Sequence, residues 1–295
     1  MKKNVWLANK FRTILTSISP KLNTKVTYFV KFHKRLDLDN PVTLNEKILW
    51  LKFNTYWNNP LVKQCADKFK VREYIDKCGL SSILNELIDV YESPEQIEWE
   101  KLPQSFALKL NIGCGFNYIV PDKNKEDFVS VKKEVARWIK LSKTQYLSYS
   151  EMQYKDVKPY ILVEKYLGRD TGELPDDYKF YCLNGKAQYV MICVDRKKGK
   201  HAKFYYFDRN WSKMPYSADY FADPDRVIPK PAHIDEAFDV AEKLSKEFPF
   251  VRTDLYIVGD KIIFGELTFT PSGGMDNGRL PETDRILGEQ LRLPK

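Results

Sequence analysis

The sequence lacks the short motifs of the common nucleotide, hydrolase and zinc sites. Its 295 residues contain no GxGxxG, GxxxxGK(S/T), GxSxG or CxxC pattern, which excludes the dinucleotide-binding, P-loop and α/β-hydrolase fingerprints. The three histidines form no HxH or HExxH motif, so we predict no zinc site. The five cysteines are odd in number and irregularly spaced, which predicts free thiols in a reducing, cytoplasmic compartment.

Long apolar runs are also missing. No run approaches the roughly 18–20 residues that span a bilayer, and the N-terminus has neither the continuous apolar segment nor the cleavage site of a secretory signal. Hydrophobic residues nevertheless make up 43% of the chain. The chain can therefore bury a core, and we do not expect it to be disordered.

Acidic residues do not occur before Asp37, whereas nine lysines and arginines do. The rest of the chain has 39 basic and 40 acidic residues, so the formal charge of +8 belongs to the N-terminal segment, and we predict no nucleic-acid partner. Five apolar side chains follow helical spacing over residues 5–18 and predict an amphipathic basic helix: Leu7, Phe11, Ile14, Leu15 and Ile18. Two interpretations stay open. Either this helix packs on the protein's own body, or residues 1–36 make a peripheral contact with anionic lipid at the inner face of the cytoplasmic membrane.

The first 80 residues predict helices and the remainder predicts short strands. Thr43 and Glu46 form a capping box that begins one helix, and residues 61–78 predict another that ends at Gly79. Further helices are predicted over residues 126–141 and 234–247, and β-rich runs over 106–110, 160–166, 179–183, 187–194, 203–207, 254–258 and 261–267. Asn184-Gly185 and Gly259-Asp260 predict hairpin turns. Antiparallel strands with a few helices indicate an α+β fold.

Two carboxylates are the most informative candidates for chemistry. Asp254 and Glu266 each interrupt an apolar strand on either side of the Gly259-Asp260 turn, so pairing across the turn brings them close. Facing carboxylates repel unless a cation lies between them, and Mg²⁺ takes carboxylates together with substrate phosphates. Arg252 lies two residues before Asp254 and therefore points to the same face of the strand. The alternative is that the two acids lie on a solvated face of the sheet.

Three other strand segments carry charged residues. Lys109 precedes a loop with Gly113 and Gly115, a combination that suits an anion but also occurs on plain surfaces. Residues 161–168 form an apolar strand with one glutamate, Glu164, and offer either a backbone edge for adenine or an ordinary strand. Lys179 lies in a strand of alternating character and points into a cleft or into water.

Taken in order, these segments resemble the ATP-grasp superfamily, specifically its teichuronopeptide-biosynthesis (TupA-like) branch. The resemblance covers nearly the whole chain. It rests on Asn40–Lys52, Ala66–Tyr74, Leu102-Pro103, Lys109 with its glycine loop, Asp176–Phe180 and Glu266–Pro271.

The resemblance implies an ATP-grasp fold, in which two α+β subdomains sandwich ATP, with a short helical N-terminal extension. We expect residues 1–60 to form the basic, mostly helical segment and residues 61–295 to form the catalytic region. The implied ATP-binding residues are Lys68, Lys109, Gly113, Gly115 and the adenine linker Glu164, Lys165, Tyr166 and Leu167. The implied magnesium ligands are Asp254, Glu266 and Thr268, and the implied catalytic residues are Lys179, which reaches the terminal phosphate, and Arg252, which steadies an acyl-phosphate.

Three features depart from the branch's pattern. Ile112 and Cys114 replace polar residues of the glycine loop, and Thr268 replaces the asparagine that many ATP-grasp enzymes use as a third metal ligand. The large N-terminal α/β domain of the superfamily is missing, since about 100 residues precede Lys109.

The implied activity is an ATP- and Mg²⁺-dependent carboxylate–amine ligase that forms an amide through an acyl-phosphate. Its substrates would be a sugar acid or amino acid and an amine in bacterial surface-polysaccharide biosynthesis. A glycosyltransferase or a kinase in the same pathway is the alternative.

Overall fold

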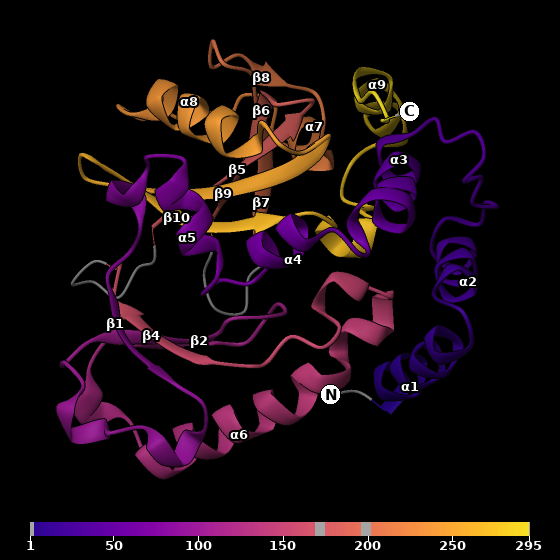
Figure 1. Cartoon of the computed structure of the whole chain (residues 1–295). Coiled ribbons are helices and arrows are strands. Elements are labelled where there is room, and N and C mark those ends of the chain that lie inside the picture. Colours follow the sequence, from indigo (N-terminus) through magenta and orange to yellow (C-terminus); the bar gives the residue numbers. More distant parts are fainter. Residues whose placement is uncertain (1–2, 169–174, 196–201, 295) are drawn as a thin grey trace. The chain divides into compact units, whose positions relative to one another are not determined.

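The computed structural model describes residues 3–168, 175–195 and 202–294, and for residues 3–6 it describes the backbone alone. The chain divides into two compact units that alternate along the sequence. Unit 1 comprises residues 1–35, 57–74 and 85–174, and unit 2 comprises residues 36–56, 75–84 and 175–295. Each unit contains one sheet and several helices (Figure 1), which confirms the expected α+β class.

Unit 1 is built on a four-stranded antiparallel sheet in the order β1-β4-β2-β3. Its strands are β1 (Leu87–Tyr91), β2 (Phe106–Leu110), β3 (Asn117–Val120) and β4 (Ile161–Lys165). Helix α6 (Phe128–Gln145) lies along one face of this sheet (Figure 1) and buries Val131, Val135 and Trp138 against Phe106, Leu108, Ile161 and Val163. The other helices of unit 1 are α1 (Lys3–Ile18), α2 (Pro20–Phe32) and α4 (Pro60–Ala66).

Unit 2 is built on a six-stranded antiparallel sheet in the order β10-β9-β5-β6-β7-β8. The strands are β5 (Asp177–Leu183), β6 (Lys186–Val194), β7 (Lys203–Phe207), β8 (Lys213–Met214), β9 (Phe250–Val258) and β10 (Lys261–Thr268). The helices are α3 (Leu44–Leu51), α7 (Ala218–Ala222), α8 (Ile234–Ser245) and α9 (Pro281–Gln290). Helix α5 (Val71–Lys77) crosses from unit 1 to unit 2.

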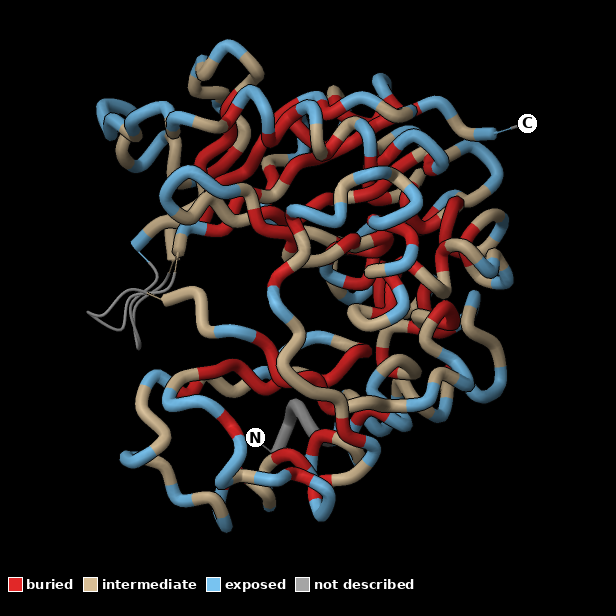
Figure 2. The backbone as a smooth tube through the Cα atoms, turned by 60° about the vertical axis from the view of Figure 1, so that its left-hand side comes forward, coloured by how far each residue is buried: buried red, intermediate tan, exposed pale blue. Residues whose placement is uncertain are grey.

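The core of unit 2 lies between its sheet and α8. This helix buries Ile234, Ala237, Phe238 and Ala241, and their spacing of three and four residues places them on one face. The Phe238 ring meets the Phe180 ring of β5 edge to face at 4.9 Å. Buried residues follow the central strands of each sheet (Figure 2).

Most expected elements are confirmed. The seven predicted strands, the helix after the Thr43–Glu46 capping box and both hairpins are present. Asn184 and Gly185 both have positive φ, 53° and 74°, which is the conformation of a tight two-residue hairpin turn. The prediction missed six helices and strands: β1, β3, β8, α2, α7 and α9. Apart from α2 and α9, each of these elements has five residues or fewer, which is too short to show a clear periodic pattern.

The prediction of a single helix over residues 61–78 is wrong. The chain forms α4 and α5, interrupted by a turn over residues 67–70. The Asp67 side chain causes the interruption, because its Oδ1 accepts hydrogen bonds from the backbone N–H groups of Phe69 and Lys70 at 2.8 and 3.1 Å. An aspartate that binds its own following amides in this way stabilises a turn in place of a helix.

The two units cross the boundary that we expected at residue 60. Helix α3 lies before that boundary and belongs to unit 2, where it packs against α9. Residues 57–74 begin just before residue 60 and continue beyond it, and they belong to unit 1. The described residues contain no helix long and apolar enough to cross a membrane.

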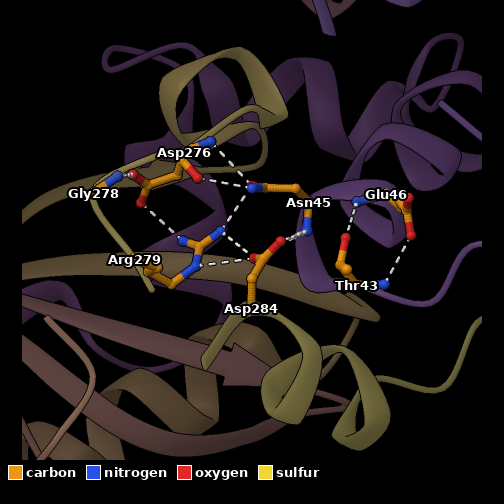
Figure 3. A network of polar contacts seen from close by, with 7 residues as sticks. All are labelled: Thr43, Asn45, Glu46, Asp276, Gly278, Arg279 and Asp284. Carbon is orange, nitrogen blue, oxygen red and sulfur yellow. Dashed lines mark hydrogen bonds and ion pairs between the residues drawn. The ribbon is translucent and has the colours of Figure 1, made fainter. Parts of the chain in front are cut away.

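A buried polar network attaches α3 to the C-terminal part of unit 2 (Figure 3). The Arg279 guanidinium is fully buried and donates hydrogen bonds to Asp276, Asp284 and the side-chain oxygen of Asn45. Asn45 in turn accepts from the backbone N–H of Asp276 at 3.0 Å and donates to its carbonyl at 2.8 Å. The segment that follows β10 is therefore held by a residue more than two hundred positions earlier in the chain.

We expect Arg279→Met to destabilise the protein by about 3–5 kcal/mol, because it leaves Asp276 and Asp284 without their buried counter-charge. The matched control is Arg285→Met on α9, whose ion pairs with Glu282 and Glu289 contribute little to stability because water and salt screen them. Urea unfolding followed by circular dichroism measures both. Equal shifts of the two midpoints would contradict this assignment of the network.

Candidate functional site

Lys68 in unit 1 is positioned by the turn that separates α4 from α5. Its backbone N–H donates to the carbonyl of Asn111 at 2.7 Å, and its Nζ donates to the carbonyl of Gly113 at 2.9 Å. The Asn111 side chain donates to Asp67 Oδ2 at 2.8 Å. Lys68 is thus attached through its backbone and its side chain to the loop that follows β2.

The glycine loop itself depends on backbone conformations that favour glycine. Gly113 and Gly115 have φ of 75° and 76°, in the left-handed region. A Cβ on Gly113 would also lie 2.8 Å from the Gln145 side-chain oxygen and 3.0 Å from the Phe116 ring. Cys114 between them is exposed, and its carbonyl accepts from Gln145 Nε2 at 3.3 Å.

Lys109 meets Glu164 on one face of the unit 1 sheet. Lys109 in β2 lies opposite Leu162 of β4, and Glu164 lies opposite Ala107, so the two charged side chains are diagonal neighbours. Lys109 Nζ and Glu164 Oε2 are 2.6 Å apart, with about a fifth and a tenth of the two side chains exposed. The positive charge that we predicted for phosphate binding is therefore balanced by the carboxylate of Glu164.

Arg72 adds a second cation near Glu164. Its Nη1 donates to the carbonyl of Asn85 at 3.0 Å. Burial lowers the pKa of Arg72, and the negative charge of Glu164 opposes that shift. Glu164 thus interacts with both Lys109 and Arg72.

The predicted adenine linker begins inside the sheet and ends beyond it. Glu164 and Lys165 are the last residues of β4. The backbone N–H of Lys165 donates to the Glu86 carbonyl, and the Lys165 carbonyl accepts from Asn85, both at 3.0 Å. Tyr166 and Leu167 follow the strand and are half-buried, so they are the part of the linker that lies outside the hydrogen-bonded sheet.

In unit 2 the predicted site residues form rows across three neighbouring strands. Glu266 of β10 lies opposite Asp254 of β9, and Asp254 lies opposite Lys179 of β5. Thr268 lies opposite Arg252 in the neighbouring row. The register therefore confirms that the Gly259-Asp260 hairpin brings Asp254 and Glu266 together.

Asp254 is the most enclosed member of this group. It is 2% exposed, and Arg252 binds both of its oxygens, with Nε to Oδ1 and Nη2 to Oδ2 at 2.7 Å. Lys179 Nζ lies 2.7 Å from Asp254 Oδ2 and 2.5 Å from Asp177 Oδ2. The cations that relieve the repulsion between the carboxylates are thus Arg252 and Lys179.

Glu266 and Thr268 are more accessible. A third of the Glu266 side chain is exposed, and its Oε1 lies 3.6 Å from Arg252 Nη2. Thr268 Oγ1 donates to Glu266 Oε1 at 3.0 Å and accepts from Arg252 at 3.2 Å. The hydroxyl therefore links the arginine and the glutamate.

Burial and pairing act in opposite directions on the charged groups. Burial lowers the pKa of Lys179, but the negative charges of Asp254 and Asp177 outweigh it, so the pKa is raised overall. Burial raises the pKa of Asp254, and the positive charges of Arg252 and Lys179 oppose that shift. The result is a desolvated cluster in which each charge depends on its neighbours.

The donor set of Asp254, Glu266 and Thr268 suits Mg²⁺. Two carboxylates and a hydroxyl supply hard oxygen ligands, and Mg²⁺ usually takes one or two carboxylates and completes its shell with water and phosphate. Among the described residues no group of three or more Asp, Glu, His or Cys side chains could hold a metal by itself.

Four residues of this arrangement were not predicted as site residues. They are Asp67 and Asn111, which hold Lys68, Arg72, which interacts with Glu164, and Asp177, which pairs with Lys179. Asp177 has a signal in the sequence, because a residue two positions before Lys179 in a strand shares its face. Asp67 also has a local signal, because an aspartate can bind its own following amides and form a turn. Arg72 and Asn111 act on residues far away along the chain, which no local pattern reveals.

Comparisons with solved structures give weak likenesses. The D-alanine–D-alanine ligase from Bacillus anthracis is 18% identical with a TM-score of 0.44, and the match covers 76% of this chain and 62% of that chain. The D-alanine–D-alanine ligase from Helicobacter pylori is 14% identical with a TM-score of 0.43, covering 87% and 68%. An N5-carboxyaminoimidazole synthase from Aspergillus clavatus, in complex with ADP and 5-aminoimidazole ribonucleotide, is 13% identical with a TM-score of 0.41, covering 70% and 45%.

Comparison with curated proteins gives no match. A family model described as TupA-like ATPgrasp matches residues 46–292. This region contains every predicted site residue from Lys68 to Thr268. The chain therefore belongs to the TupA-like ATPgrasp family, and its two α+β units form an ATP-grasp fold.

Proposed function

We propose that the protein is an ATP- and Mg²⁺-dependent carboxylate–amine ligase. The observation that carries the proposal is the cluster of Asp254, Glu266, Arg252 and Lys179 on one face of the unit 2 sheet. A desolvated group of paired carboxylates and cations is suited to a metal-bound polyphosphate. In the proposed reaction, a substrate carboxylate attacks the γ-phosphorus of ATP and releases ADP. An amine then displaces phosphate from the acyl-phosphate to form the amide.

The residues of the two units have separate roles in this proposal. In unit 1, Lys68, Lys109 and the backbone of Gly113 and Gly115 bind phosphate, and residues 164–167 bind adenine. In unit 2, Asp254, Glu266 and Thr268 would hold Mg²⁺, which when bound supplies positive charge next to the phosphate oxygens. Lys179 binds the terminal phosphate and Arg252 stabilises the acyl-phosphate. These roles are electrostatic, as phosphoryl transfer requires.

The ion pairs of the two lysines fit these roles. Lys109 is held by Glu164, and Lys179 is held by Asp177 and Asp254. This pairing restricts the side chain of each lysine, and such preorganisation reduces the entropy lost when a phosphate binds. Binding of an anion would replace one carboxylate contact with another charge-assisted contact.

We propose that the carboxylate substrate is a sugar acid or an amino acid, and that the amide belongs to a bacterial surface polymer such as a capsule or teichuronopeptide-like chain. The support is the family membership and the resemblance to the teichuronopeptide branch. We also propose that the enzyme works in the cytoplasm, at the inner face of the membrane. The acid-free segment of residues 1–36 supports this location.

The glycosyltransferase alternative would need a metal site for a nucleotide sugar. Two Asp-x-Asp pairs begin at Asp37 and Asp223, but both residues have structural contacts. Asp37 Oδ1 accepts from the backbone N–H groups of Asp39 and Asn40 at 2.9 Å, and Asp223 pairs with Lys203. The unit 2 cluster therefore favours the ligase over the transferase. It favours a kinase equally, so products must separate those two.

The function is tested by incubating the full chain with ATP, Mg²⁺ and pools of amino acids and uronic acids, followed by mass spectrometry. We expect ADP, phosphate and an amide in equal amounts, and hydroxylamine should trap the acyl-phosphate as a hydroxamate. A stable phosphorylated product would show a kinase instead. Release of UDP from a sugar nucleotide without use of ATP would show a transferase.

We expect Glu266→Gln to lower Mg²⁺-dependent turnover by a factor of about 10³ or more, because it removes the charge of one proposed metal ligand. Glu266 is the sharper choice than Asp254. Asp254→Asn should abolish turnover as well, but it also leaves the buried cations Arg252 and Lys179 without a negative partner, which destabilises the fold. The apparent Mg²⁺ affinity is measured by titration and the stability by the melting temperature. Together they separate an effect on metal binding from an effect on folding.

Glu242→Gln on α8 is the matched control for Glu266→Gln. Its side chain is 22% exposed and pairs with Lys186 and Arg209, so it removes a glutamate charge of similar exposure outside the site. Unchanged activity of Glu266→Gln would contradict the metal assignment.

We expect Lys109→Met to weaken ATP binding by about tenfold to a hundredfold, since one charge-assisted phosphate contact contributes roughly 1.5–3 kcal/mol. Glu164 keeps Arg72 as a neighbouring cation, so the fold should tolerate the change. Isothermal titration with a non-hydrolysable ATP analogue measures the affinity. Lys186→Met, which removes an exposed lysine, should leave the affinity unchanged, and equal losses in the two variants would exclude Lys109 from the nucleotide site.

A further inference from the structure

Helix α1 exposes its apolar side chains to solvent. Leu7, Phe11, Ile14 and Ile18 are spaced four, three and four residues apart, so they lie on one face of the helix. Their exposed fractions range from 50% for Leu7 to 70% for Ile18. One interpretation of the sequence places this apolar face against the protein's own body. In the structure the same face is exposed to solvent.

The next helix, α2, continues this pattern. Phe29 and Val30 are 53% and 62% exposed. Isolated exposed apolar residues are ordinary on protein surfaces, but a row along one helix that is followed by more on the next marks an interaction site.

Polar side chains make the contact between these helices and the rest of unit 1. Thr16 Oγ1 donates to the Leu147 carbonyl at 2.6 Å and shares a hydrogen bond of 2.8 Å with the Ser150 hydroxyl. Asn23 Nδ2 donates to Ser150 Oγ at 3.0 Å and to the Ser148 carbonyl at 3.3 Å. Thr16 and Asn23 are buried. This buried hydrogen-bonded seam fixes which face of α1 points outward.

The exposed face is also positively charged. Lys10, Lys21 and Lys25 are exposed on the same two helices. Lys10 lies three residues after Leu7, and Lys25 lies four residues before Phe29, so on a helix each is next to an exposed apolar residue. Residues 1–36 contain no acidic side chain, and this segment precedes the region that matches the ATP-grasp family.

We propose that the exposed faces of α1 and α2 form a docking surface for an anionic lipid bilayer. This inference rests on the proposed location of the enzyme and names the surface and its partner. The apolar row of Leu7, Phe11, Ile14 and Ile18 enters the boundary between headgroups and acyl chains, and the lysines bind anionic headgroups. The polar seam keeps α1 and α2 folded in solution, so the surface is formed before it meets the membrane.

Charge complementarity favours a bilayer over a second copy of the chain. Two copies of a face that carries lysines and no acids repel each other when they meet. An anionic leaflet attracts the lysines and also accepts apolar side chains, so it satisfies both components of the surface.

The test uses the full chain and sedimentation with two kinds of vesicle, phosphatidylcholine alone and phosphatidylcholine with phosphatidylglycerol. One variant combines Phe11→Ser, Ile14→Ser and Ile18→Ser, and another combines Lys10→Gln, Lys21→Gln and Lys25→Gln. Since each lysine near an anionic surface strengthens partitioning about fivefold, the lysine variant should bind about a hundredfold more weakly. The serine variant should lose binding that persists at high salt, because salt screens charge but not apolar insertion.

Two control variants change the same residue types elsewhere. One combines Val129→Ser, Phe221→Ser and Val227→Ser at exposed apolar positions, and the other combines Lys101→Gln, Lys125→Gln and Lys186→Gln at exposed lysines. Both should bind anionic vesicles as the unchanged chain does. ATP consumption in solution is measured for every variant and should not change, so a failure of lipid binding stays separate from a failure of the proposed ligase activity.

The proposal is overturned if the unchanged chain does not sediment with anionic vesicles, or if the control variants lose as much binding as the surface variants. A serine variant that still binds like the unchanged chain would also overturn it. If instead the chain dimerises in light scattering and the serine variant does not, the surface is an interface between copies and not a membrane site.

Discussion

The candidate site depends on one constraint, which is that the buried carboxylate of Asp254 needs positive partners. An unpaired carboxylate in this position would be strongly disfavoured. Arg252 and Lys179 come from the same strand and from its neighbour, and each of them requires further acids, Glu266 and Asp177. The residues proposed for metal and phosphate binding therefore hold one another in place. Mutual pairing of this kind fixes the positions of the charges, and preorganised charges are what electrostatic catalysis requires.

Unit 1 uses the same principle with fewer charges. Lys109 is paired with Glu164, and Lys68 is held by carbonyl groups of the glycine loop and of Asn111. The short turn at Asp67 is essential to this arrangement. A continuous helix through this region would carry Lys68 on a regular helical surface, whereas the turn lets its backbone N–H bind the loop after β2.

The N-terminal part of the chain contains two regions with different contacts. Asn45, near the N-terminus, shares a buried network with Asp276, Arg279 and Asp284 (Figure 3). This network fixes the segment that follows β10, the strand that carries the proposed metal ligands Glu266 and Thr268. The helices before it have an opposite character, with polar residues buried and apolar residues exposed. The two N-terminal regions therefore serve the molecule differently, one by holding the protein together and the other by offering a surface.

The sequence by itself determined seven of the strands and the two hairpins with tight two-residue turns. Alternating apolar residues and the Asn184-Gly185 and Gly259-Asp260 turns set the register that places Asp254 opposite Glu266, because a tight turn leaves few ways to pair its flanking strands. The sequence also indicated the family through an ordered set of short motifs. Only the tertiary structure decided which cations neutralise the carboxylates, that Asp67 interrupts the expected helix, and that the apolar row of α1 faces outward. The Asp67 turn is local, but helical spacing and turn formation compete there and the spacing alone did not decide between them. The other two outcomes depend on contacts between residues far apart in the chain, and periodicity within one segment carries no information about the partner that will cover it.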